Sequence, residues 1–205
     1  MLSKEHLDEL LEEFPELKSS DLILQKEVFA HFGLLFMALG ILEHGLINAA
    51  MLLGAANDFS KSEIKTVQKW ADLIDVQFEN ATKLTFGNLV KRLVKNSSFK
   101  LLEEELLEAK SIRNYFAHHF MRNESDLFSA PDGCYLLMHR MLMTRKRVKE
   151  VSVLIDETTE QFMRRIGLPK ISDSEVHNYM NELKVSVAQR LTSGTGEAGW
   201  LKNVR

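Results

Sequence analysis

The sequence predicts an all-helical bundle built around two long helices. Long stretches of the 205-residue chain carry neither proline nor glycine, since only three Pro and ten Gly occur in it. Apolar residues recur three or four positions apart over most of the chain, which is the period of one side of a helix. No stretch shows the β-branched alternation typical of a strand, and no repeat period stands out.

The first two helices are expected before residue 57. A short helix over about 3–14 ends before Pro15. A long helix then begins at Ser20 or Asp21, either of which can cap free backbone N–H groups, and continues to about Ala56. Its buried side is predicted from residues spaced three or four apart, which are Phe29, Phe32, Phe36, Leu39, Leu46, Ile47 and Ala50.

Three shorter helical segments follow. A helix over about 62–82 is expected to bury Val67, Trp70, Leu73, Ile74 and Phe78. Thr85 is expected to cap a short helix that contains Leu89, Val90 and Leu93. Ser98 opens the next helix, whose apolar stripe consists of Leu102, Leu106, Ala109, Ile112, Phe116 and Phe120.

The last third of the chain contains the second long helix. Asn, Ser, Pro and Asp residues predict a loop over 121–133. A long helix from about Tyr135 to Ile166 is expected to stop at Gly167 before Pro169, which is a C-terminal helix signal. A final helix is expected over about 173–191.

Composition points to a single cytoplasmic domain. The length suits one domain, over 1–191, followed by a glycine-containing tail over 192–205 that we expect to be mobile. The single cysteine, Cys134, excludes an intrachain disulfide and is expected to pack in the core. No apolar signal segment opens the chain, and the apolar run 32–42 is much shorter than the about 20 residues that cross a bilayer. We therefore expect a core helix there and no membrane partner.

The segment RNYFAHH, residues 113–119, brings together groups suited to chemistry on RNA. Arginine holds a permanent charge that suits phosphate, and histidine can exchange a proton near neutral pH. Metal and cofactor motifs are absent, since the chain has no H-E-x-x-H, no Glu-x-x-His and no phosphate-binding glycine loop. His118 and His119 are adjacent, so they lie about 100° apart on a helix and pair poorly on one metal. We expect no metal and no cofactor.

This segment resembles the R-N-x-x-x-H signature of the HEPN superfamily of small helical proteins, many of which are ribonucleases. The resemblance covers roughly residues 21–121. It implies a HEPN-like bundle with Arg113 and His118 as catalytic residues. HEPN folds similarly place a polar residue of an early helix beside the motif arginine, and here that position falls to Glu43. Asn114, Tyr115 and His119 are expected to support the motif.

The spacing of the motif raises a geometric problem that the resemblance helps to resolve. Five residues turn a helix by 500°, so Arg113 and His118 lie about 140° apart on a straight helix. Either the helix unwinds near His118, or the two residues act with their copies from a second subunit. HEPN ribonucleases resemble the second case, which implies a homodimer with two motifs facing each other across one cleft.

The expected function is metal-independent cleavage of RNA through the 2′-OH, in a toxin, defence or RNA-processing role, with an antitoxin or regulator as a further partner. A non-catalytic module that binds RNA or a nucleotide is the alternative. A third reading makes Glu43, Arg113 and His118 a buried polar network that holds the helices in register. Basic residues at Arg140, Arg145, Lys146 and Arg147 are candidates for RNA phosphates, or simply a solvated helix face.

Overall fold

The computed structural model describes residues 12, 23–59, 67–167 and 173–192. This described part consists of helices and turns and contains no strand, so the predicted all-helical class is confirmed. The helix expected over 3–14, apart from residue 12, and the tail beyond 192 lie outside the described residues.

The chain divides into two compact units, Met1–Phe162 and Met163–Arg205, and each is described by itself. The single domain expected over 1–191 therefore remains a prediction. In the second unit, helix α8 spans Asp173–Thr192 and corresponds to the expected final helix.

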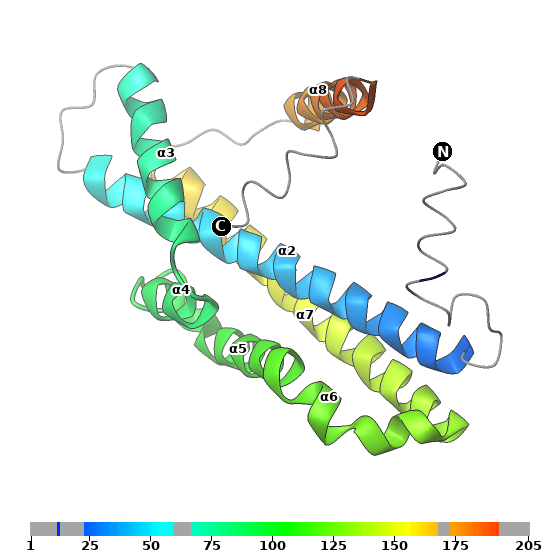
Figure 1. The fold of residues 1–205 in the computed structure, drawn as a ribbon. Helices are drawn as coiled ribbons and strands as arrows, with labels where there is room; N and C mark the ends of the chain where they lie inside the picture. Colours follow the sequence, from blue (N-terminus) through cyan, green and yellow to red (C-terminus); the bar gives the residue numbers. More distant parts are fainter. Residues whose placement is uncertain (1–11, 13–22, 60–66, 168–172, 193–205) are drawn as a thin grey trace. The chain divides into compact units, whose positions relative to one another are not determined.

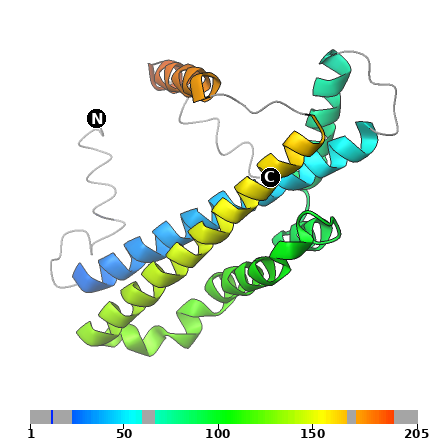
Figure 2. The same ribbon diagram turned by 180° about the vertical axis from the view of Figure 1, so that it is seen from behind.

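Two long helices run side by side in the same direction through the first unit (Figure 1). They are α2, Ile23–Phe59, and α7, Pro131–Arg165, and the view from behind shows the same pairing (Figure 2). Helices α4, Phe86–Leu93, and α5, Glu103–His118, lie along this pair, and α3, Val67–Thr82, contacts α2.

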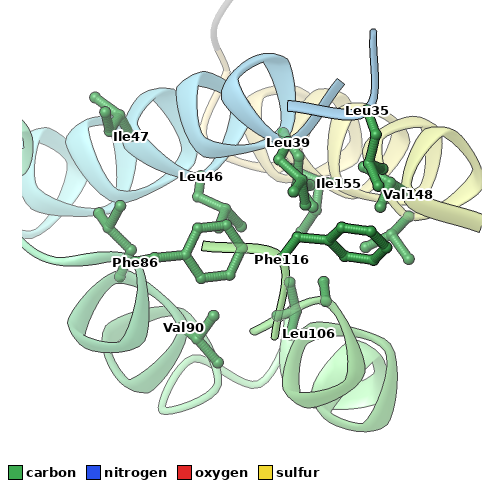
Figure 3. Close-up of a cluster of buried hydrophobic side chains, with 14 of the residues drawn as sticks. Leu35, Leu39, Leu46, Ile47, Phe86, Val90, Leu106, Phe116, Val148 and Ile155 are labelled. Atoms are coloured by element: carbon green, nitrogen blue, oxygen red, sulfur yellow. The ribbon is translucent and has the colours of Figure 1, made fainter. Parts of the chain in front are cut away.

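The core lies where these elements meet (Figure 3). Leucine, valine and aromatic side chains from α2, α4, α5 and α7 interlock there. Each such side chain contributes about 1.5–3 kcal/mol when it is fully buried. The residues labelled in the close-up are Leu35, Leu39, Leu46, Ile47, Phe86, Val90, Leu106, Phe116, Val148 and Ile155.

The buried side of α2 is rotated from the predicted one in its first half. Phe29 and Phe36 were expected inside, yet they are 53% and 45% exposed. The buried line is instead Val28, Leu35, Leu39, Leu42 and Leu46. Since α2 is apolar around much of its circumference, spacing alone could not select the side that packs.

Helix α2 is therefore a core helix on one side only. By length and composition it could also cross a membrane over Ile23–Asp58, where its most apolar window has a mean hydropathy of 1.6 and is 33% buried.

The helix boundaries before α5 follow local capping chemistry. Thr85 caps α4 as predicted, with its side chain accepting from the N–H of Asn88. Ser98 does not open α5, because its N–H donates to Asn96 Oδ1 and a 3₁₀ turn, η2, Lys100–Leu102, precedes the helix. On α3, Phe78 is 40% exposed rather than buried.

The loop predicted over 121–133 is largely helical. Helix α6, Phe120–Asn123, and a 3₁₀ helix η3, Ser125–Ser129, fill it. Helix α7 begins at Pro131 rather than Tyr135, because proline suits the first helical position, where its missing N–H is not needed. Gly167 follows the last turn with a φ of 79°, so the predicted C-terminal signal is confirmed.

Candidate functional site

The RNYFAHH segment ends at a break in the helix. Helix α5 stops at His118, and His119 adopts φ −125° and ψ −29° before α6 begins at Phe120. The N–H of His119 still donates to the carbonyl of Tyr115 at 2.8 Å, so the chain leaves the helix just after this bond. The break follows His118, so Arg113 and His118 both lie within the regular part of α5 and stay about 140° apart around it.

Aromatic packing anchors this break on α2. The rings of Phe116 and Phe120 stack with their centroids 4.9 Å apart. Phe32 of α2 lies against both, at centroid distances of 6.4 Å and 5.4 Å. Phe116 and Phe120 are buried, so these apolar side chains hold the segment on α2.

Three polar residues of the motif, Arg113, Asn114 and His118, are not paired with any described residue. Arg113 is half-buried, whereas Asn114 and His118 are exposed. None of the three side chains makes a hydrogen bond or an ion pair within the described part of the chain. The cation of Arg113 is thus available to an anion from outside the chain.

The expected contact between Glu43 and Arg113 is absent, although Glu43 is also half-buried. The reason is the register of two antiparallel helices. With Phe32 beside Phe116, Glu43 lies about 16 Å further along α2, and Arg113 only about 5 Å back along α5. The buried network of Glu43, Arg113 and His118 is therefore not formed.

His119, unlike His118, has a polar neighbour. An Arg122 guanidinium nitrogen lies 3.1 Å from His119 Nδ1. Because guanidinium only donates, Nδ1 accepts in this bond, and the ring proton is then on Nε2. The rings of His118 and His119 are 6.3 Å apart and inclined by 75°. Among the described residues, no group of three or more His, Cys, Asp or Glu is placed to hold a metal ion.

Tyr115 is held on the other side of α5. Its hydroxyl donates to Glu124 Oε1, and Arg140 Nη1 donates to Glu124 Oε2 at 3.0 Å. Burial, followed by the hydrogen bond to Glu124, raises the pKa of Tyr115 to about 12. The hydroxyl therefore stays protonated at neutral pH with its proton directed at Glu124.

A groove of about 710 Å³ lies beside this network, between α5 and α7. It is lined by Ser111, Ile112, Tyr115, Phe116, Phe120, Glu124, His139, Arg140, Met143 and Thr144. Arg113 and His118 do not line it. Arg113 and Tyr115 are two residues apart, so they point about 160° away from each other around α5.

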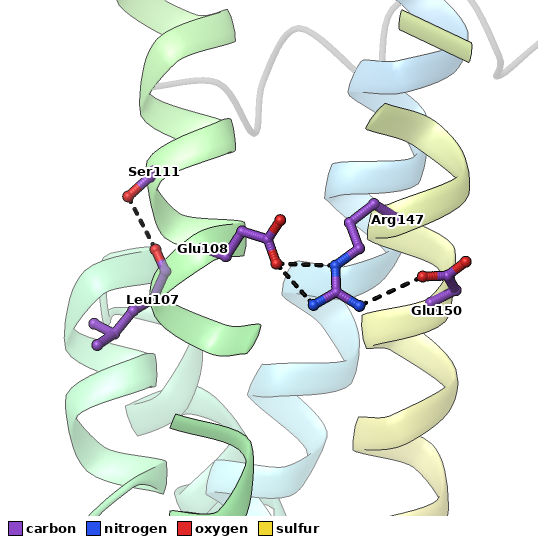
Figure 4. A network of polar contacts seen from close by, with 5 residues as sticks. All are labelled: Leu107, Glu108, Ser111, Arg147 and Glu150. Atoms are coloured by element: carbon purple, nitrogen blue, oxygen red, sulfur yellow. Dashed lines mark hydrogen bonds and ion pairs between the residues drawn. The ribbon is translucent and has the colours of Figure 1, made fainter. Parts of the chain in front are cut away.

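Two turns earlier along α5, a second polar contact joins this helix to α7 (Figure 4). Arg147 donates to Glu108 from Nε at 2.9 Å and from Nη2 at 2.8 Å, and it reaches Glu150 at 3.4 Å. The side of α5 that faces α7 is thus occupied by structural polar contacts.

The predicted basic cluster of α7 is split between two sides of the helix. Arg140 and Arg147 are seven residues apart and lie on the same side, and both are paired with glutamates. Arg145 is about 140° away from Arg140 around the helix and, with Lys146, lines a different groove against α2. The four residues do not form one phosphate-binding surface.

Glu124 is the residue that sequence reasoning missed. It accepts hydrogen bonds from both Tyr115 and Arg140, yet it lies in the segment predicted as a loop, and no periodicity marks it.

Comparison with known proteins adds no assignment, because no family model, no curated protein and no solved structure matches this chain.

Proposed function

We propose that this protein is a metal-independent endoribonuclease of HEPN type, with Arg113 and His118 as its catalytic residues. The proposal rests on the lack of hydrogen bonds and ion pairs at three polar side chains of the motif. The side chains of Arg113, Asn114 and His118 make no hydrogen bond or ion pair with a described residue, and His118 is the last residue of α5. Polar groups left unpaired beside a buried aromatic anchor are suited to an external ligand, here an RNA phosphate.

In the proposed reaction the ribose 2′-oxygen attacks the adjacent phosphorus and the bond to the 5′-oxygen breaks. A motif histidine takes the 2′-OH proton, and a histidine delivers a proton to the leaving 5′-oxygen. Arg113 stabilises the charge that develops on the phosphoryl oxygens. Asn114 orients the motif. The products are a 2′,3′-cyclic phosphate and a 5′-hydroxyl.

A homodimer would supply the second motif, and α2 offers a surface for it. We define the exposed side of α2 as its accessible apolar residues, which are Phe29, Leu34, Phe36, Met37 and Ile41. Gly33 and Gly40 add open positions where a Cβ would meet nothing within 4 Å. Helices with such small residues can approach closely, and a two-fold axis here would cover the apolar side.

The dimer is tested by placing a charge on this surface. Met37 is 64% exposed, so Met37→Glu should leave the monomer folded and prevent association. Leu101→Glu is the matched control, because Leu101 is 87% exposed and lies on η2 rather than on α2. Light scattering that gives a 23.5 kDa monomer for the wild type at micromolar concentration would contradict the dimer.

The ribonuclease proposal is tested by incubating the purified protein with total RNA in EDTA. Cleavage should persist without metal, leave 2′,3′-cyclic phosphate ends and spare DNA, which lacks the 2′-OH nucleophile. Arg113→Ala should abolish it, whereas Arg164→Ala, which removes an exposed arginine far along α7, should not. RNA left intact by a folded wild-type dimer, across varied substrates, would reject the ribonuclease.

The second candidate is a non-catalytic module that binds RNA or a nucleotide through the same residues. One observation favours it, because Arg113 and His118 diverge on a single chain and no described residue pairs with either. RNA that is bound but not cleaved by the wild type, with binding lost in Arg113→Ala, would select this candidate. For either function we propose a cytoplasmic protein controlled by an antitoxin or another regulator.

A further inference from the structure

The groove between α2 and α7 combines an apolar floor with unpaired positive charge. It has a volume of about 580 Å³ and is lined by Ala38, Ile41, Leu142, Arg145, Lys146, Lys149, Ser152, Val153 and Asp156. The three cations Arg145, Lys146 and Lys149 make no ion pair or hydrogen bond with any described residue. An apolar floor beside such cations suits an amphipathic, acidic occupant.

The chain itself carries a segment of this kind. Residues 1–22 hold seven acidic side chains and two lysines. Within them the apolar residues follow the i, i+3, i+4, i+7 spacing that places a stripe along one side of a helix. These are Leu7, Leu10, Leu11 and Phe14, and the acids Glu5, Asp8, Glu9, Glu12 and Glu13 fall around the rest of the same helical wheel.

We propose that residues 3–14 dock as an amphipathic helix in the groove between α2 and α7, with their leucines on its floor and the acids that flank the leucine stripe beside Arg145, Lys146 and Lys149. This interaction uses none of the motif residues on α5, and it shares one residue, Ile41, with the exposed side of α2.

The dimensions of the chain permit this docking. From Leu142 to Asp156 the groove follows α7 for about 21 Å, and a helix over 3–14 is about 18 Å long. The connection over 15–22 can span up to about 26 Å when extended. Ala38 lies about 22 Å along α2 from Ile23, so the connection reaches the groove.

The position of Ile23 favours one direction for the docked helix. Helices α2 and α7 run the same way, so the Leu142 end of the groove is nearer the start of α2 (Figure 1). The connection from Ile23 then brings Phe14 to that end, and the docked helix runs antiparallel to α7. Glu13 then comes level with Arg145 and Lys146, and Asp8 with Lys149. These two acids flank the leucine stripe at about 110° from its middle, whereas Glu9 and Glu12 lie about 150° from it.

Hydrogen–deuterium exchange on the full-length chain tests the proposal. Amides of 3–14 should be protected in the wild type, and the double reversal Lys146→Glu with Lys149→Glu should speed their exchange at least about tenfold. Adding Asp8→Lys and Glu13→Lys, the two acids that flank the leucine stripe, to that variant should restore protection, because the charges are complementary again. Lys91→Glu with Lys95→Glu is the matched control, since both lysines are exposed on the α4 side and outside the groove.

Four results would overturn the docking. Free exchange of 3–14 in the wild type would do so, and so would an equal loss of protection in the control. Protection that grows with protein concentration would assign the groove to a second copy of the chain. If 3–14 exchange freely while the wild type, and not the groove variant, sediments with phosphatidylglycerol vesicles, the occupant is an anionic membrane instead.

Discussion

The two sides of α5 differ in how their polar groups are used. On the side that faces α7, Tyr115 is bonded to Glu124, and Glu108 is bonded to Arg147. On the other sides, Arg113 and His118 make no hydrogen bond or ion pair within the described part of the chain. Within the described part of the chain, α5 thus has one side whose polar groups are mostly paired, apart from the buried Oε2 of Glu105, and another side whose polar groups are unpaired.

The difference separates residues that hold the fold from residues that are available for function. Hydrogen bonds to charged groups contribute about 1.5–3 kcal/mol each when buried and less when exposed. A side chain without partners contributes little of this kind to stability, so its removal should spare the fold. Substitutions of Arg113 and His118 should therefore change the proposed activity while leaving the free energy of unfolding nearly unchanged.

The largest effect is expected from His118. If the proposed chemistry holds, His118→Ala should lower the cleavage rate by about 10²–10⁴, because proton transfer is lost. Its unfolding midpoint should stay close to the wild type, because the exposed ring makes no hydrogen bond with a described residue. Arg113→Lys should also fail in cleavage, since a point charge does not replace a bidentate fork.

Single-turnover cleavage and urea unfolding of the same preparations measure both quantities. His119→Ala should reduce the rate less, and His177→Ala on α8 is a control that removes an exposed histidine elsewhere. A His118→Ala protein that loses stability and rate together would erase the contrast between the two sides of α5.

The next largest effect, on the free energy of unfolding, is expected at Gly133, where the start of α7 packs against η3. An alanine Cβ at Gly133 would lie 2.1 Å from the carbonyl oxygen of Leu127, which is backbone and cannot swing away. Gly133→Ala should therefore destabilise the protein by about 1–3 kcal/mol. The displaced η3 would disturb the connection between Glu124 and α7 without touching Arg113.

Urea unfolding measures this cost, with Gly40→Ala as the matched control. A Cβ at Gly40 meets nothing within 4 Å, so in dilute protein this change should stabilise α2 by about 0.5–1 kcal/mol. Equal destabilisation by the two substitutions would show that the packing at Gly133 is not special.

The fold was largely predictable because it depends on periodicity and caps. The long helices, the Thr85 cap and the glycine stop at Gly167 all follow from local rules. The side of α2 that packs in the core does not follow from local rules, because Phe29 and Phe36 satisfy the same spacing as the residues that are buried. Only the positions of the neighbouring helices decide which apolar side is covered.

The sequence identified the residues of the candidate site but not the contacts that they make. The spacing placed the RNYFAHH segment on a helix whose apolar stripe ran to Phe120, and α5 in fact ends at His118. The pairing of Glu43 with Arg113 failed because it depends on the axial register of α2 and α5, which spacing within one helix does not contain. The bond between Tyr115 and Glu124 was missed because it joins α5 to a segment that was expected to be a loop.

A smaller effect, which depends on pH, is expected from Tyr115. Tyr115→Phe removes the bond to Glu124 and should cost about 1 kcal/mol at pH 8. The folded pKa of about 12 lies above the unfolded value of about 10, so the native state favours the neutral hydroxyl. This stabilisation is complete below pH 10 and is lost as the pH rises toward 12.

Urea midpoints at pH 8, 10 and 11 should therefore show the wild type approaching Tyr115→Phe as the pH rises. Tyr135→Phe is the matched control, because Tyr135 is 58% exposed and makes no hydrogen bond with a described residue. A constant gap between wild type and Tyr115→Phe across this range would mean that the hydroxyl does not ionise later in the folded protein.

The smallest effect is expected from Arg147, although its contacts look the most extensive in Figure 4. Its side chain is 38% exposed and that of Glu108 is 46% exposed, so water screens the pair. Arg147→Ala should cost at most about 1 kcal/mol in urea unfolding, and the loss should shrink at high salt. Lys83→Ala, which removes an ion pair within one turn on a fully solvated surface, should cost still less. A loss above about 3 kcal/mol for Arg147→Ala would mean that the ion pair between α5 and α7 behaves as a buried pair. The paired side of α5 would then contribute more to the stability of the unit than its exposure suggests.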